Sequence, residues 1–413
     1  MNAPPQRAAL WSQPNFRWLM AGGLLSLLGD QCTLIALPWL VLKLTGDPLA
    51  LGLVVALMGI PRAIFILVGG ALVDRYSPKR VMMLSKHANA LLLALLAALT
   101  FSGAATLPVV YALAFTIGLA QAFGIPSGTS MLPQAVPPQL LQAANGTLMG
   151  LRQLTMLVGP LCAALLLAAG GNDVRALGWA FAADCASFIL SALTLARVRP
   201  IAATAPAPES GVLRAVGAGL TMVWRDVALR TCFLYWGLVA FCIGGAMQVA
   251  LPLLASATLH GASSYGMLLA AHGGGTLLGM AASLLAPRIA LPFGALLLLG
   301  DALAGLLVLP LGGIDTAWQG MLLLLALGVV GGFLQVAIFT WIQRRVPPQM
   351  LGRAMSIFMF IFMGLAPLSA AGAGWLLQFV TLAQLFAGGG AVLVACAAGA
   401  WLFTPMRNIA AAR

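Results

Sequence analysis

Five ionisable residues interrupt long apolar stretches of this 413-residue chain. They are two acids and two arginines in the first half and one acid in the second: Asp30, Arg62, Arg152, Asp184 and Asp301. A charged side chain at the middle of a bilayer costs about 2.5–3.5 kcal/mol on insertion scales unless it is paired or hydrated. Acids and arginines in such places can relay protons or bind a charged ligand, so these five residues are the candidates for chemistry.

Helical spacing puts the charges of the first half next to polar or small neighbours. Ser26, Asp30 and Thr33 fall at i, i+4 and i+7 and would form one polar stripe on a helix. Arg62 shares a helical face with two glycines, which permit another helix to come close. Arg152 shares its face with a threonine and a third glycine. These charges are therefore expected to face other helices and not lipid.

We hypothesise a buried network in which Asp30 and Asp184 neutralise Arg62 and Arg152. Removal of water favours the protonated form of a carboxyl group, and an adjacent arginine favours the ionised form. An acid poised between the two influences could take up a proton from one side of the membrane only. The alternative is a static set of salt bridges that fixes the packing of the helices.

Other polar residues within apolar stretches have more than one interpretation. Asp301 has no evident partner and could bind a cationic substrate, carry a proton, face a wet cavity or serve the fold alone. His272 precedes three glycines and is either a hydrogen-bonded packing residue or a proton carrier. Gln121 and Gln335 could line a cavity or form interhelical hydrogen bonds. We predict a substrate cavity that includes these two glutamines, His272 and Trp39.

The composition identifies the elements that must position these residues. The chain is 62% hydrophobic and 7% charged, too few charged residues to cover a soluble globule. A helix needs about 20 residues to cross a bilayer core of about 30 Å. Twelve apolar stretches are long enough: 18–42, 49–73, 81–102, 107–130, 143–169, 176–196, 229–257, 263–286, 292–311, 316–343, 351–380 and 382–403. They lack the period-2 alternation of barrel strands. We predict an all-α membrane protein with twelve transmembrane helices.

The stretches divide into two groups of six around a connector. We predict an N-terminal six-helix bundle at 1–197, a connector at 198–228 and a C-terminal six-helix bundle at 229–413. Residues 212–227 of the connector are expected to form a short interfacial helix that carries Arg225 at the headgroups.

The distribution of basic residues predicts the orientation. If both termini are cytoplasmic, Lys43 and Arg175 are the only basic residues of the outer loops, whereas seventeen of the 21 Lys and Arg lie on the inner side. The remaining two lie within the spans. By the positive-inside rule, both termini are predicted to be cytoplasmic. We expect a multi-pass protein of the cell inner membrane that acts as a monomer.

The two groups of helices are related by an internal repeat. Four pairs recur at an offset of 214 residues: Leu37-Pro38 with Leu251-Pro252, Gly52 with Gly266, Gly118 with Gly332, and Gln121 with Gln335. Six spans, an even number, separate the copies, which indicates a parallel repeat about an axis along the membrane normal. The partners of two charges at this offset are uncharged, Gly244 for Asp30 and Thr276 for Arg62. From Val136-Pro-Pro-Gln, which recurs as Val346-Pro-Pro-Gln, the offset is 210, and the partner of Arg152 is the uncharged Phe362. If the fold required these charges, the second half should have them too, so their absence there favours a functional role.

The loop after the second span carries a family signature, which is Gly70-Ala-Leu-Val-Asp74-Arg75-Tyr-Ser-Pro-Lys79-Arg80. It resembles the cytoplasmic loop of the major facilitator superfamily, in which Gly is followed after three residues by Asp-Arg and then by two basic residues. This chain has Ser77 where the family usually has Gly. The resemblance implies that Asp74, Arg75, Lys79 and Arg80 form a gating loop that holds the two halves together on the cytoplasmic side. Arg353, near the start of the eleventh span, is the expected docking place.

Two further stretches narrow the resemblance to one branch. Gly146, Thr155 and Gly159-Pro160 are similar to the antiporter signature of proton-coupled drug exporters, with Thr155 where that pattern has Gly. Gly29-Asp30 and the residues through Gly46 are similar to the branch of enterobactin exporters and macrolide-efflux proteins, and the resemblance runs from about residue 10 to 403. It implies the major facilitator fold and export of a small amphipathic molecule, such as a drug or siderophore, by proton antiport through alternating access.

Other functions fit the sequence less well. Proton-coupled uptake, passive facilitation and transport of a lipid-like substrate remain alternatives. The three histidines are dispersed and there is no phosphate-binding loop, so we expect neither an enzyme nor an ATP-driven pump, and no cofactor or metal. The basic residues lie in short connectors, so no nucleic-acid partner is expected. The predicted partners are a small-molecule substrate, protons and the lipid bilayer.

Overall fold

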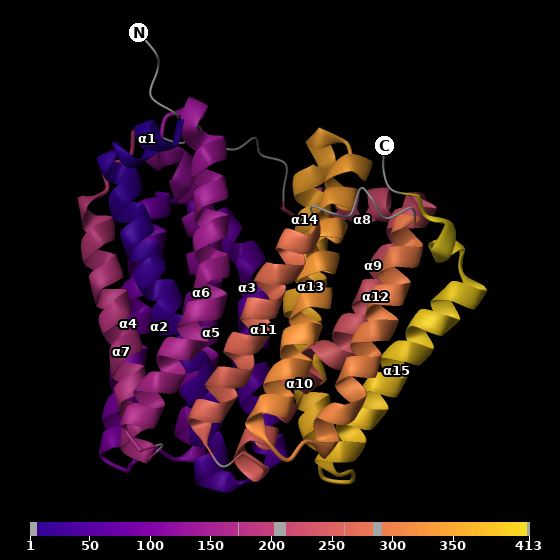
Figure 1. The fold of residues 1–413 in the computed structure, drawn as a ribbon. Coiled ribbons are helices and arrows are strands. Elements are labelled where there is room, and N and C mark those ends of the chain that lie inside the picture. The colour runs from indigo at the N-terminus through magenta and orange to yellow at the C-terminus, as the bar shows by residue number, and fades with distance from the viewer. Residues whose placement is uncertain (1–5, 172, 202–211, 260, 284–290, 411–413) are drawn as a thin grey trace. The chain divides into compact units, whose positions relative to one another are not determined.

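The chain folds into two compact helical units (Figure 1). The computed structural model describes residues 6–171, 173–201, 212–259, 261–283 and 291–410, and no strand occurs in those ranges. Unit 1 comprises Met1–Gly46 and Leu57–Glu209, and unit 2 comprises Asp47–Ala56 and Ser210–Arg413.

Unit 1 is built from α1 to α7, with a short 3-10 turn, η1. Their bounds are α1 Gln6–Trp11, α2 Pro14–Thr45, α3 Pro48–Arg75 (whose first residues belong to unit 2), α4 Pro78–Phe101, α5 Leu107–Ala135, η1 Pro138–Leu140, α6 Leu141–Ala169 and α7 Val174–Arg197. Proline begins α2, α3 and α4, where its missing N–H would have no helical partner anyway. Asp173 caps α7 by accepting a hydrogen bond from the Val174 N–H.

Unit 2 contains α8 to α15. Their bounds are α8 Val212–Arg225, α9 Val227–Val239, the π-helical turn η2 Ala240–Gly244, α10 Gly245–Ala257, α11 Ala262–Ala282, α12 Phe293–Val308, η4 Leu309–Gly313, α13 Ala317–Arg345, α14 Pro348–Leu376, α15 Leu382–Phe403 and η5 Pro405–Asn408. The segments α9, η2 and α10 follow one another without a break and correspond to the span predicted at 229–257. A helix is also present where the connector was predicted to contain one.

Eleven helices of the described residues are long and apolar enough to cross a membrane. The exception among the twelve predicted spans is 263–286, which coincides with α11. That helix carries Ser263, Ser264 and His272 along with a run of glycines, which dilute its apolar character. The prediction of an all-α multi-pass membrane protein is confirmed.

Glycines set the closest helix crossings inside each unit. In unit 2, side chains added at Gly275 and Gly279 of α11 would meet the backbone of α13, and one at Gly328 of α13 would meet the backbone of α11. In unit 1, side chains added at Gly22 and Gly29 of α2 would meet hydroxyl groups of α7. The glycines of α11 thus allow its backbone to approach that of α13 closely.

Candidate functional site

A polar seam runs between α2 and α7 in unit 1. Gly29 leaves room for the side chain of Asp184, which is only 1% exposed. The Thr33 hydroxyl donates to Asp184 Oδ2 at 2.5 Å, and the Ser187 hydroxyl donates to Oδ1 at 3.1 Å. Both carboxyl oxygens therefore have hydrogen-bond donors, and these donors are neutral hydroxyls. The seam fixes the position of this acid without an ion pair.

Lys86 of α4 is buried beside the same seam. Its Nζ donates to the Ser191 hydroxyl at 2.5 Å and lies 3.5 Å from the Ser26 hydroxyl, and Ser191 in turn donates to the Gly22 carbonyl. The residue is 5% exposed. Lys86 is one of the seventeen basic residues predicted for the inner side, and its side chain points into the helix bundle of unit 1 and not into a loop.

Asp30 and Arg62 are joined through a glutamine. The Arg62 Nη1 donates to Gln121 Oε1 at 3.5 Å, and the Gln121 Nε2 donates to Asp30 Oδ1 at 3.4 Å. Asp30 also interacts electrostatically with Lys86 and Arg62. Of the two roles predicted for Gln121, the structure shows the interhelical hydrogen bond. The predicted pairing of Asp30 with Arg62 is thus indirect.

Among the described residues, Arg152 forms no ion pair with Asp30 or Asp184, the two acids of the hypothesised network. Its Nε is buried and has no hydrogen-bond partner among the described residues, and the same is true of the Arg62 Nε. In the part of the chain that the structure describes, the only ion pair within 4.0 Å joins Asp226 to Arg345 at 2.9 Å, at the start of α9 and the end of α13. Hydroxyls of α2 and α7 contact the Asp184 carboxylate, and among the described residues no ion pair joins this carboxylate to Arg152.

Asp301 of α12 has a neighbour that sequence reasoning missed. The Tyr235 hydroxyl of α9 interacts with its carboxylate, although the contact does not reach the geometry of a formed hydrogen bond. No regular spacing connects α9 to α12, so nothing in the sequence pairs these residues. Unit 2 therefore holds one acid beside one phenol.

The other residues predicted for a substrate cavity take different positions. His272 Nδ1 lies 3.3 Å from the Leu324 carbonyl, which matches its interpretation as a hydrogen-bonded packing residue. Gln335 is exposed. Trp39 is 4% exposed, and its Nε1 is buried without a hydrogen-bond partner among the described residues, so it lines no open cavity in this structure.

The predicted gating loop is described in part. The side chains of Asp74 and Arg75 lie outside the described residues. The Lys79 Nζ donates to the Ala196 and Val198 carbonyls at 3.0 and 2.7 Å, at the end of α7, and Arg80 is exposed. In unit 2, Arg353 Nη1 contacts the Met350 sulfur at 3.2 Å. Lys79 thus serves a helix end within its own unit.

The described residues contain no group of three His, Cys, Asp or Glu side chains able to hold a metal ion. What unit 1 offers is a set of polar and charged groups from α2, α3, α4, α5 and α7, of which Lys86 and Asp184 are buried and Asp30, Arg62 and Gln121 are half-buried. Such a set can bind, release or redistribute protons and can bind a charged ligand.

The Major Facilitator Superfamily matches residues 19–371 of this chain. The chain belongs to this superfamily. It is similar to the enterobactin exporter EntS of Escherichia coli O81 (strain ED1a), with 26% identity over 345 residues, 83% of this chain and 80% of the relative. The corresponding protein of Shigella boydii serotype 18 (strain CDC 3083-94 / BS512) has the same identity and coverage.

Solved structures of transporters share the fold. The nucleoside transporter NupG gives a TM-score of 0.73 with 15% identity and covers 94% of this chain and 100% of its own. A bacterial homologue of the iron transporter ferroportin in the inward-facing state gives 0.71 with 14% identity, over 93% and 98% of the two chains. This chain is therefore a multi-pass membrane transporter that acts on small molecules, and it is not an enzyme.

Proposed function

We propose that this transporter exports a small amphipathic molecule, such as a siderophore or drug, in exchange for protons by alternating access. It would lie in the inner membrane as a monomer with both termini cytoplasmic. The observation that carries the proposal is the buried cluster around Asp30 in unit 1. Static packing would not need two acids and two cations in one unit when unit 2 holds one acid between its helices.

Asp30 is the better proton carrier of the two acids in unit 1. Asp184 accepts from two hydroxyls, the shorter contact being 2.5 Å, so its carboxylate is held by its neighbours. Asp30 accepts a long hydrogen bond of 3.4 Å from Gln121, and it lies within the electrostatic range of Lys86 and Arg62. A carboxyl group that is weakly bound between two cations can exchange its proton with little rearrangement.

Unpaired arginine atoms favour a cargo that carries oxygen acceptors. The Nε atoms of Arg62 and Arg152 have no hydrogen-bond partner among the described residues. A buried donor without a partner costs about 1–3 kcal/mol, which a carboxylate or phenolate of a bound molecule would recover. The similarity to an enterobactin exporter supports the same class of cargo. We therefore expect the substrate to be an acidic, aromatic molecule and not a cationic dye.

Transport in proteoliposomes tests the proposal. The purified chain would be reconstituted and loaded with a catecholate siderophore, a macrolide or a cationic dye, and efflux would be measured with and without an imposed proton gradient. We expect a proton gradient to accelerate siderophore efflux. Asp30→Asn should lower the gradient-driven rate about 100-fold, because proton transfer by a positioned side chain typically contributes about 10²–10⁴-fold to the rate of a reaction step.

Asp173→Asn is the matched control for that experiment. Asp173 is an exposed helix cap, and asparagine caps a helix equally well, so its transport should be unchanged. Efflux that ignores the proton gradient would indicate passive facilitation. Gradient-driven accumulation on the opposite side would indicate uptake. An Asp30→Asn variant with full gradient-driven efflux would leave the cluster with a packing role alone.

A further inference from the structure

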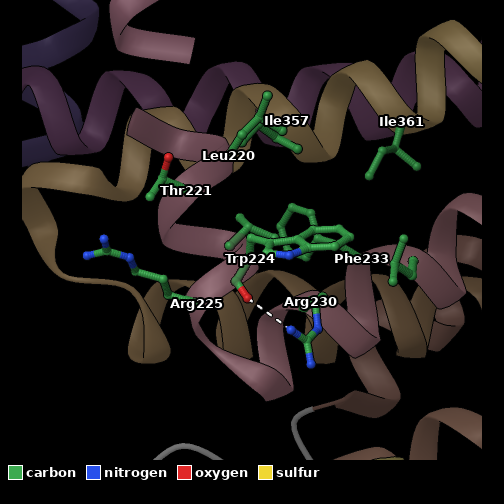
Figure 2. Close-up of a pocket in the computed structure, with 10 residues that line it drawn as sticks. Leu220, Thr221, Trp224, Arg225, Arg230, Phe233, Ile357 and Ile361 are labelled. Atoms are coloured by element: carbon green, nitrogen blue, oxygen red, sulfur yellow. Dashed lines mark hydrogen bonds between the residues drawn. The ribbon is translucent and has the colours of Figure 1, made fainter. Parts of the chain in front are cut away.

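A groove of about 560 Å³ lies in unit 2 between α8, α9 and α14 (Figure 2). Its apolar lining comes from all three helices: Leu220, Trp224, Phe233, Leu234, Ile357 and Ile361. Phe233 is 3% exposed and forms part of the core, whereas Trp224 is 62% exposed. In Figure 2, Ile357 and Ile361 lie above Trp224 and Arg230 lies below it. The groove is thus apolar along its length with cationic groups beside it.

Helix α8 forms one wall because its apolar residues recur at helical spacing. Leu220, Val223 and Trp224 fall at i, i+3 and i+4, and Val223 is buried in the core of unit 2. Gly219 lies against Arg353 and Ile357 of α14, so α8 approaches α14 closely at this point. Trp224 is left on the open side of the helix, where it meets the groove and not the core.

Two arginines, Arg225 and Arg230, are among the residues that line the groove, and the acid between them in sequence pairs with neither. The Arg230 guanidinium lies over the Trp224 ring at 5.6 Å and donates to the Trp224 carbonyl at 3.3 Å. Arg225 is exposed. Asp226 accepts from the Ala228 and Leu229 N–H groups and pairs with Arg345 at 2.9 Å. Because this acid is already engaged, the groove keeps a net positive charge.

We propose that this groove is a binding site for an anionic phospholipid. The phosphate would lie between Arg225 and Arg230, and an acyl chain would lie along Trp224, Leu234 and Ile361. The positive charge and the apolar lining of the groove fit a single lipid molecule. Basic residues on an amphipathic helix next to a transmembrane helix are typical of anionic-lipid recognition. A soluble anion would use the arginines without needing the apolar length of the groove. The site is separate from the buried cluster of unit 1 and does not depend on the proposed function.

Native mass spectrometry of the full, delipidated chain tests the proposal. The protein in detergent would be titrated with phosphatidylglycerol and, separately, with phosphatidylcholine of the same acyl chains. We expect one phosphatidylglycerol to bind at least about tenfold more tightly than phosphatidylcholine. The Arg225→Gln/Arg230→Gln variant should weaken that binding about 25-fold, since each arginine near an anionic lipid contributes about fivefold.

Two more variants separate this groove from general attraction to charge. Arg407→Gln removes an exposed arginine of unit 2 that does not line the groove and should leave the lipid affinity unchanged. Ile361→Trp fills the groove without altering charge and should weaken binding about tenfold by loss of buried apolar area. Equal binding of the two lipids, an unaltered affinity in the double-arginine variant or in Ile361→Trp, or a dimer whose formation excludes lipid would each overturn the proposal.

Discussion

Unit 1 and unit 2, which the sequence predicts to be related by an internal repeat, differ in chemistry at the matched positions. Three charged residues within the helices of unit 1 match uncharged residues of unit 2 at an offset of 214 residues: Gly244 for Asp30, Thr276 for Arg62 and Gly300 for Lys86. The space beside Gly300 is taken by the Leu334 side chain. If the two units are repeats, the fold does not require charges at these positions.

The position of Asp30 shows the difference most clearly. In unit 1 it lies within α2, a helix of 32 residues without interruption. In unit 2 the equivalent Gly244 ends the π-helical turn η2, and the next N–H, of Gly245, donates to the Ser369 hydroxyl of α14. A π turn frees backbone groups from the helical ladder, and a side chain of a neighbouring helix then satisfies them. Unit 2 has a backbone irregularity where unit 1 has an acid.

The largest effect is expected from Lys86→Met. This change removes a buried cation that contacts Ser191 and Ser26 and that interacts with Asp30. We expect the free energy of unfolding to fall by about 3–5 kcal/mol, the range observed when one partner of a buried charged pair is removed. Unfolding of the purified protein in mixed micelles, followed by circular dichroism during a sodium dodecyl sulfate titration, measures the change.

The repeat offers a control for this prediction. Gly300→Ala alters the equivalent position of unit 2, where Leu334 is a flexible neighbour, and should cost about 1–3 kcal/mol by overpacking alone. The double variant Lys86→Met/Asp30→Asn should recover part of the loss, because it removes the acid together with its cation. A Lys86→Met variant as stable as the wild type would mean that the charges of unit 1 do not depend on one another.

The burial of Lys86 was not predictable from the sequence. The positions of Asp30, Arg62 and Asp184 follow from their places deep within apolar runs, and all three are found between helices. Lys86 lies eight residues after the proline that begins α4, so its depth in the membrane depends on where the helix begins. The sequence predicts only that Lys86 lies toward the inner side. Its contact with Ser191, more than 100 residues away in sequence, is seen in the structure alone.

A somewhat smaller effect is expected at the helix crossing of unit 2. In Gly279→Leu, the new side chain would meet the backbone of Val329 and Phe333 in α13, which cannot move aside as a side chain can. We expect a loss of about 3 kcal/mol, at the upper end of the usual cost of overpacking. The same titration measures it.

Gly128→Leu provides the comparison in unit 1, because nothing lies within 4 Å of a Cβ atom added there. Leucine favours a helix by about 0.8 kcal/mol over glycine, so this variant should be as stable as the wild type or slightly more so. Equal losses in both variants would show that α11 and α13 are not packed more closely than α5 is at Gly128.

Helix positions were predictable to within a few residues, whereas the pairing of residues between helices was not. The apolar runs and flanking prolines mark helices such as α5 and α13, because a membrane span needs a fixed length of apolar chain. Which side chains meet depends on the rotation and crossing of each helix. That is why Asp184 could be predicted as buried but the Thr33 hydroxyl that contacts it could not, and why Tyr235 beside Asp301 was missed.

The pair formed by Tyr235 and Asp301 should contribute modestly. Tyr235→Phe removes the hydroxyl that faces the carboxylate, and we expect a loss below about 1 kcal/mol, the usual net value of one hydrogen bond, because this contact lacks the geometry of a formed one. In Asp301→Asn the buried acid is replaced by a neutral amide, which should change stability by less than about 1 kcal/mol because, among the described residues, no cation within 4.0 Å is left behind. Thermal unfolding of the two variants tests this. A loss of several kcal/mol in Asp301→Asn would mean that unit 2 also depends on a buried charge.

The smallest effect is expected from Lys79→Met, which decides between two roles for one residue. Its Nζ donates to the Ala196 and Val198 carbonyls at the end of α7, where a cation is favoured by the unpaired carbonyls of the helix. Because the side chain is partly exposed, the loss should be about 0.5–1 kcal/mol. In unit 2, the equivalent Phe293 stacks on Trp341 with ring centroids 4.8 Å apart, so an uncharged side chain occupies this place in the repeat.

If Lys79 is only a helix cap, Lys79→Met should transport at the wild-type rate in proteoliposomes. If it also belongs to the proposed gating loop, the rate should change well beyond what this loss of stability explains, and Lys79→Arg should restore it.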